Sequence, residues 1–216
     1  MTSEDTQIRA FWQWFLDHQA EFKSLSNPDE PFWDIAAGQL KKVHERFWFE
    51  LSNVNNGVRE FVVTAEGHVE AFPVAELLVN LAPEVEGWAF VALKPPMGFT
   101  FTTRYEGIVF DPSAMWFLPL ESASNSQEFG MRVGIEGLQS MDETTAHNAV
   151  LVMLDTALGE RSAALDIQHT EVSDLPPDPK SQGYIELPEL PDYIAWRKKT
   201  QSQPPVERAG FSATED

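Results

Sequence analysis

The sequence contains no cysteine. This absence excludes disulfide bonds, thiolate nucleophiles and the zinc and iron–sulfur centres that need cysteine ligands. A chain of 216 residues can nevertheless bury most of the apolar surface that its unfolded form exposes, so the fold requires no covalent staple. Because a chain without cysteine suits a reducing compartment, we expect a cytoplasmic protein of bacterial type.

Basic residues are scarce as well. The chain has 15 Lys and Arg but 34 Asp and Glu, which gives a net charge of −19 at pH 7. Nucleic acids and anionic membrane surfaces attract clustered cations, and the one basic cluster, Arg197 to Lys199, is too short to reverse this charge. We therefore expect the protein to bind neither nucleic acid nor membranes.

Long apolar runs and the signatures of common chemistries are also missing. No run approaches the roughly 20 residues of a membrane-spanning helix, and the acidic start of the chain does not resemble a secretory signal. The sequence contains no G-x-S-x-G, no H-E-x-x-H, no P-loop and no G-x-G-x-x-G motif. These absences favour a soluble protein that uses no cofactor and has another protein as its partner.

Two helices are predicted near the N-terminus. The first has apolar residues at the i, i+3, i+4, i+7 spacing of one helix face: Ile8, Phe11, Trp12 and Phe15. The second follows Pro31, which suits the first turn of a helix, and carries an apolar stripe over residues 32–43. Further along, the sequence predicts a helix over residues 73–81 and a long helix that Ser140 and Glu143 cap and Gly159 ends.

From Phe47 onward the apolar spacing changes to the period of two that is typical of strands. Asn55-Asn56-Gly57 predicts a tight hairpin turn, because Asn-Gly accepts the positive φ angles of a type I′ turn. The predicted strands cover residues 47–52, 58–64, 88–93, 99–105, 107–110, 115–120, 128–135 and 163–167.

This order of elements predicts an α+β fold with a mostly antiparallel sheet covered by helices. We expect one domain over residues 1–200 and a disordered tail over residues 201–216. Two stretches share the order β-β-α-β, which suggests an internal duplication. Their residues scarcely align, however, and such units also recur in unrelated folds, which is the alternative explanation.

Several short motifs run through the chain: Phe47 to Leu51, Val63 to Gly67, Phe72-Pro73, Ala82-Pro83, Gly87-Trp88, Leu154 to Glu160 and Leu187 to Pro191. Together they resemble a family of uncharacterised bacterial α+β proteins, a domain of unknown function. The resemblance covers residues 8–195 and implies a single bacterial domain. It implies no activity, substrate, cofactor or site residue.

We expect no tightly bound metal, and the candidate ligands, should one be bound, are Glu66, His68 and Glu70. On a strand, positions i, i+2 and i+4 share one face, and carboxylate and imidazole groups bind divalent metals. The alternative is a turn at Gly67, which would scatter the three side chains.

Two further residues are candidates for catalysis. His169 lies two residues from Glu171, and it would join His68 only if their strands were neighbours. Asp155 lies beside the apolar stripe of the long helix, where burial would raise its pKa and suit an acid or base. The alternatives are an exposed strand end for His169 and an ion pair with a Lys or Arg for Asp155.

Trp14 and Trp48 are candidate interaction residues, because exposed tryptophans often contribute strongly to interfaces. The alternative is a second layer of core under the sheet. Taken together, the sequence favours a non-catalytic soluble binding or interaction protein. The rival functions are a small metal-assisted hydrolase that uses Glu66, His68 and Glu70, and an acidic protein, like an immunity protein, that blocks a basic partner.

Overall fold

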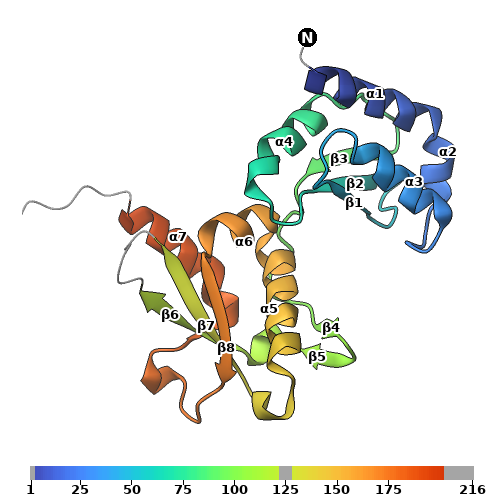
Figure 1. Cartoon of the computed structure of the whole chain (residues 1–216). Helices are drawn as coiled ribbons and strands as arrows, with labels where there is room; N and C mark the ends of the chain where they lie inside the picture. The colour runs from blue at the N-terminus through green and yellow to red at the C-terminus, as the bar shows by residue number, and fades with distance from the viewer. Residues whose placement is uncertain (1–2, 122–127, 202–216) are drawn as a thin grey trace, which may run out of the picture.

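The computed structural model describes residues 3–121 and 128–201 (Figure 1). It confirms the α+β fold, with strand pairs that are mostly antiparallel. The helices are α1 (Ser3–Asp17), α2 (Gln19–Ser24), α3 (Pro31–Leu40), α4 (Phe72–Asn80), α5 (Glu143–Leu158), α6 (Glu160–Asp166) and α7 (Leu190–Gln201). The strands are β1 (Trp48–Leu51), β2 (Arg59–Thr64), β3 (Trp88–Ala92), β4 (Thr103–Tyr105), β5 (Ile108–Phe110), β6 (Trp116–Glu121), β7 (Phe129–Ile135), β8 (His169–Asp174) and β9 (Ile185–Glu186).

The first unit is a three-stranded sheet in the order β1-β2-β3, with α1 to α4 packed around it (Figure 1). β1 and β2 form the predicted hairpin, and α4 connects β2 to β3, which lies parallel to β2. The turn has φ angles of 50° at Asn56 and 81° at Gly57, between the bridged residues Asn55 and Val58. Positive φ at both central residues matches the type I′ turn that the sequence predicts.

The second unit repeats this topology. β6 and β7 form an antiparallel hairpin, α5 and α6 make the crossover, and β8 lies parallel to β7. Strand β9 adds to the free side of β6, so this sheet has the order β8-β7-β6-β9. The two β-β-α-β stretches of the sequence are therefore two units with the same strand order and direction.

Each unit has its own hydrophobic core. In the first, the ring of Phe61 is fully buried, and neighbouring ring centroids lie 5.1–6.4 Å from it. These neighbours are Phe11, Trp12, Phe15, Phe22, Phe49 and Phe90. The second core forms where the apolar face of α5 meets β6 and β7, around Phe117, Met131 and Met153. The structure thus has two separate cores. That residues 1–200 form one domain stays a prediction.

Some predicted elements are wrong. Residues 160–166 form α6 rather than a strand, because the positive φ of Gly159 ends α5 and a new helix starts at once. The segment 99–105 is a strand only from Thr103. The N-cap of α5 is Asp142, which accepts a hydrogen bond from Thr145 N at 2.8 Å, whereas Ser140 lies in a preceding 3₁₀ turn.

The sequence prediction also missed α7, whose buried residues Leu190 and Ile194 follow a segment rich in proline and charge. Gln201, which we placed at the start of the tail, is the last residue of this helix. The rest of the predicted tail, 202–216, and the loop 122–127 between β6 and β7 lie outside the described residues. Among the described residues, no helix has the length and apolar character needed to cross a membrane.

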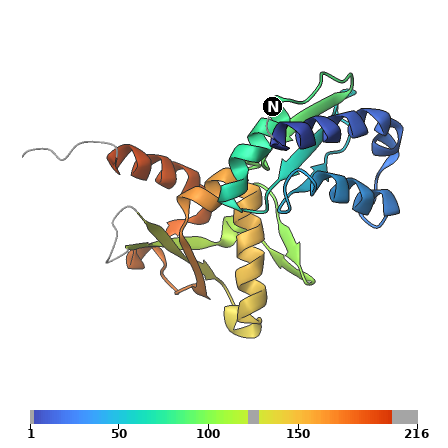
Figure 2. The ribbon, with the colours of Figure 1, turned by 45° about the horizontal axis from the view of Figure 1, so that its top comes forward.

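The segment 94–98 joins the two units and packs against the junction of α5 and α6. Met97 N and Gly98 N donate to the carbonyls of Thr156 and Ala157, both at 3.0 Å, and Glu160 N donates to Lys94 O at 3.0 Å. In Figure 2, α6 lies next to α4 of the first unit, and an ion pair between Arg161 and Glu76 links these helices.

Gly159 permits this close approach. Its φ is +77°, and a Cβ atom there would lie 2.8 Å from Pro96 N and 2.9 Å from Lys94 O. Such a contact is shorter than real Cβ atoms show, and both partners are rigid backbone atoms. A side chain at residue 159 would therefore force the two units apart.

We expect Gly159→Ala to lower the free energy of unfolding by at least about 2 kcal/mol, because a strained φ angle and a backbone clash add together. For a chain of this size, that loss lowers the Tm by about 4–8 °C in calorimetry.

Gly38→Ala is the matched control for this substitution. Gly38 lies in α3, and a Cβ there meets nothing within 4 Å. The Tm of this variant should stay the same or rise slightly, since alanine favours helices. Equal Tm values for the two variants would contradict the proposed role of Gly159.

Candidate functional site

The three candidate metal ligands lie in a turn and not on one strand face. Glu66 has a φ of 51° directly after β2, and Gly67 follows with 79°. His68 precedes a 3₁₀ turn, with its Nδ1 3.4 Å from Glu70 Oε1. The turn at Gly67 that the sequence offered as the alternative is therefore present, and it separates the side chains. Within residues 3–121 and 128–201, no group of three or more His, Asp or Glu side chains is placed to hold a metal ion.

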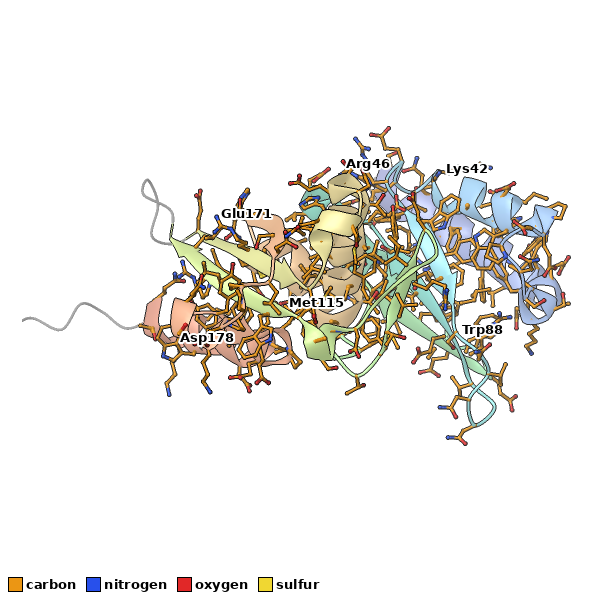
Figure 3. The ribbon with its side chains drawn as sticks, turned by 90° about the horizontal axis from the view of Figure 1, so that it is seen from below. Lys42, Arg46, Trp88, Met115, Glu171 and Asp178 are labelled. Carbon is orange, nitrogen blue, oxygen red and sulfur yellow. The ribbon has the colours of Figure 1, made fainter. Side chains whose placement is uncertain are left out.

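His169 begins β8 and is exposed. Its Nε2 lies 3.9 Å from Glu171 Oε2, while Glu171 Oε1 accepts a hydrogen bond from Arg132 Nε at 2.7 Å. Glu171 lies on the second sheet, well away from the first (Figure 3). His68 belongs to the first unit, so the structure does not place the two histidines on neighbouring strands.

Asp155 lies on α5 and forms an ion pair with Lys94, which follows β3. Lys94 Nζ also lies 4.0 Å from Glu50 Oε1 on β1. These three residues come from the first unit, the joining segment and the second unit. The structure thus shows Asp155 in the ion pair that was the alternative to a catalytic role.

Glu160 is the buried acid of this junction, with no exposed surface. Its Oε1 accepts hydrogen bonds from Ala65 N at 2.8 Å and Gly67 N at 3.0 Å, and its Oε2 accepts one from Lys94 N at 3.2 Å. A carboxylate that accepts several backbone N–H groups is well compensated for its loss of water. Glu160 therefore fixes the turn after β2, the segment after β3 and the start of α6 to one another.

The charges of the junction shift two pKa values. Burial acts to lower the pKa of Lys94, but the hydrogen bond that Lys94 donates to Asp155 and the negative charges of Asp155, Glu50 and Glu160 outweigh it and raise this pKa. Burial raises the pKa of Glu50, against the attraction of Lys94. Lys94 thus stays protonated at neutral pH, which suits an ion pair and does not supply a free amine for nucleophilic attack.

The two candidate interaction residues are both partly buried. Trp14 packs against the first core, and its ring stacks on Phe32 with centroids 5.7 Å apart. Trp48 also packs against this core, and Lys41 Nζ lies 4.5 Å from its ring centroid. The core alternative thus describes Trp14 well. A more exposed tryptophan is Trp196 on α7, with 58% of its surface accessible.

Strand β3 lies at the edge of the first sheet and pairs only with β2 among the described strands. Arg59 N donates to Gly87 O at 2.9 Å, and Leu93 N donates to Val63 O at 2.8 Å. In a parallel ladder, every second residue faces the same neighbour. Phe90 and Ala92 therefore direct their backbone N–H and C=O groups away from β2.

The outward backbone groups of this edge are open. In the part of the chain that the structure describes, no group outside the ladder bonds to the backbone of Phe90 or Ala92. On β8, the equivalent edge strand, Thr170 directs its carbonyl outward, and His147 Nε2 on α5 lies 3.0 Å from that oxygen. The edge of β8 thus carries a side-chain contact to one outward carbonyl, which the edge of β3 lacks among the described residues.

A groove of about 630 Å³ runs beside β3. The end of α4, the loop 82–86 and the side chains of Trp88 and Phe90 line it. Trp88 lies close to the end of the sheet from which the hairpin extends (Figure 3). Only 8% of Trp88 is exposed, and its Nε1 is the one buried side-chain donor without a hydrogen-bond partner among the described residues.

The rim of this groove is acidic. Glu84 and Glu86 line it and are exposed. Neither takes part in any salt bridge between described residues, whereas Glu76 and Asp155 are both paired. The groove thus combines open backbone groups, two aromatic rings and two unpaired carboxylates.

A second cavity, of about 440 Å³, lies where segment 96–98 and the end of α5 meet α6 and α7. Its lining is mostly apolar. Its main charged groups pair with each other, since Lys198 Nζ lies 2.6 Å from Asp166 Oδ2. No backbone edge opens into it, so it offers shape without a row of hydrogen-bonding groups.

Comparison of the chain with known protein families, with curated proteins and with solved structures finds no match.

Sequence reasoning missed the open edge of β3. It also missed the clamp, by which we mean the three backbone hydrogen bonds that Glu160 accepts from Ala65, Gly67 and Lys94. The strand order depends on pairing between distant residues, which no local pattern contains. For Glu160, the available signal was its place directly after Gly159, where the chain turns between two helices.

We expect Glu160→Gln to lower the free energy of unfolding by at least about 2 kcal/mol. The amide nitrogen of Gln would face a backbone N–H donor, because the two carboxylate oxygens of Glu160 both accept such bonds. The Tm should fall by about 4–8 °C. Glu136→Gln, at an exposed position, is the control and should leave the Tm unchanged. A similar Tm for both variants would show that the clamp adds no stability.

We expect Glu50→Gln to stabilise the protein slightly at pH 7 but not at pH 4. The pKa of Glu50 is raised on folding, so its favourable contribution is complete below its unfolded pKa of about 4.3 and is lost as the pH rises through the folded pKa. Gln does not titrate and avoids this loss. Because the side chain is 56% exposed, the gain in Tm should reach only about 2 °C.

Melting curves of wild type and Glu50→Gln between pH 4 and 8 check this expectation. A lower Tm for the variant at pH 7 would mean that the attraction of Lys94 exceeds the cost of burial.

Proposed function

We propose that the protein is a non-catalytic binding protein that recognises another protein through the open edge of β3. The observation that carries this proposal is the outward direction of the backbone groups of Phe90 and Ala92 beside a groove. An extended peptide can add a strand to such an edge, with main-chain hydrogen bonds for affinity and neighbouring pockets for specificity.

The hydrolase alternative has less support from the geometry. It requires Glu66, His68 and Glu70 to converge, and the bend at Gly67 turns them apart. Asp155 and Glu160 both hold the two units together. Their side chains are thus committed to partners within the chain, whereas the edge of β3 is not.

Ala92→Pro tests the proposal. Proline removes an N–H that points away from β2 and places its ring on the edge, so it blocks an added strand without loss of a ladder bond. Peptides selected on the wild-type protein from a phage-displayed random library should bind with micromolar dissociation constants. Ala92→Pro should weaken this binding at least tenfold, as measured by titration calorimetry.

Leu165→Glu is the matched control. Leu165 is 41% exposed and lies close to the cavity between α6 and α7, so this variant reports on the rival surface. Circular dichroism establishes that both variants are folded. Loss of peptide binding in Leu165→Glu but not in Ala92→Pro would contradict the proposed site, and so would a library that yields no binding peptide.

A further inference from the structure

The groove beside β3 has unpaired negative charge on one side. Glu84 and Glu86 are exposed, lie two residues apart in the loop before β3 and line the groove. No described cation pairs with either carboxylate. A partner segment with cationic side chains would supply the missing charges, and the −19 net charge of the chain would speed their encounter.

Two aromatic residues also line this groove. The rings of Trp88 and Phe90 are nearly parallel, with an interplanar angle of 4° and centroids 6.5 Å apart. Lysine and arginine bind favourably near such rings through cation–π interactions, most strongly with tryptophan. Trp88 is 8% exposed, and its indole N–H is buried without a hydrogen-bond partner among the described residues.

The spacing of these rings matches that of an added strand. Alternate residues of a strand lie about 6.6–6.8 Å apart, and their side chains point to the same face. A strand paired with β3 would thus place side chains i and i+2 at the separation of Trp88 and Phe90. A segment with basic residues at alternate positions meets both the rings and the carboxylates.

A second copy of this chain is a poor occupant of the same edge. Each copy carries a charge of −19, so two copies that pair their β3 edges repel each other. Charged residues near an exposed edge are a common protection against such self-association. The negative charge of the chain thus disfavours a second copy and favours a basic segment.

We infer that the segment added to the edge of β3 is a basic extended peptide, with Lys or Arg at alternate positions that face Glu84, Glu86 and the rings of Trp88 and Phe90. This inference rests on the proposed function and specifies the partner of its site.

Three synthetic six-residue peptides test the inference. One alternates lysine and valine, the second alternates glutamate and valine, and the third is the lysine peptide with alternate backbone nitrogens methylated. At 0.15 M salt, the lysine peptide should bind the full chain at least tenfold more tightly than the glutamate peptide. Methylation should remove this binding, because it takes away the backbone N–H groups that an added strand needs. The lysine charges remain, so binding by charge attraction alone would persist.

The protein variants separate the charges from the edge. Glu84→Gln with Glu86→Gln should weaken binding of the lysine peptide about fivefold or more. The same change at two other exposed acids, Glu136→Gln with Glu189→Gln, should leave binding unchanged. Ala92→Pro should abolish binding altogether.

The contrary outcomes are distinct. If both the lysine and the glutamate peptides bind equally and Ala92→Pro abolishes both, strand addition stands and the basic partner is wrong. If the lysine peptide binds Ala92→Pro as well as wild type, the attraction is unspecific, and the proposed function also fails. Self-association that Ala92→Pro abolishes would make a second copy the occupant and overturn the inference. Failure of all three peptides to bind wild type would overturn it as well.

Discussion

The two halves of this protein depend on one buried carboxylate. Glu160 accepts backbone N–H groups from the turn after β2 and from the segment after β3, while its own backbone begins α6. Gly159, one residue earlier, lets the chain approach Lys94 and Pro96 closely enough for these bonds. Lys94 and Asp155 add an ion pair at the rim of the same junction. A fully buried charge is tolerated only with such compensation, so the junction holds a single geometry.

Around this junction the chain builds the same topology twice and finishes it differently. In each unit a hairpin is followed by a helical crossover and a third strand parallel to the second. In the second unit, His147 contacts one outward carbonyl of the edge strand β8, and β9 adds to the other side of the sheet. The first unit adds helices α1 to α3 instead, which enlarge its aromatic core and leave the edge of β3 open. The proposed function depends on this difference.

Local patterns in the sequence predicted the local structure well. The apolar stripe from Ile8 to Phe15 and the Asn56-Gly57 turn are short-range features, and both form as expected. Prediction failed where distant contacts decide. The alternation of Ala163, Leu165 and Ile167 matches a strand, yet packing next to Gly159 makes this segment helical. The bend at Gly67, by contrast, is a local feature that the sequence indicates, and it separates Glu66 from His68. The strand order that opens the edge of β3 follows only from tertiary pairing, so sequence analysis could not locate this edge.

The clamp at Glu160 also orders the events of synthesis. Glu160 lies 95 residues after Ala65 and 93 after Gly67, whose backbone N–H groups donate hydrogen bonds to its carboxylate. During translation, the first unit emerges complete with its own aromatic core, but the turn after β2 has no buried acceptor until α5 has also been made. Contacts of such long sequence separation form late, because the intervening chain must first be ordered. A ribosome-bound chain that stops before residue 160 would thus carry a first unit whose β3 edge is already formed and whose hydrogen bonds to Glu160 are still missing.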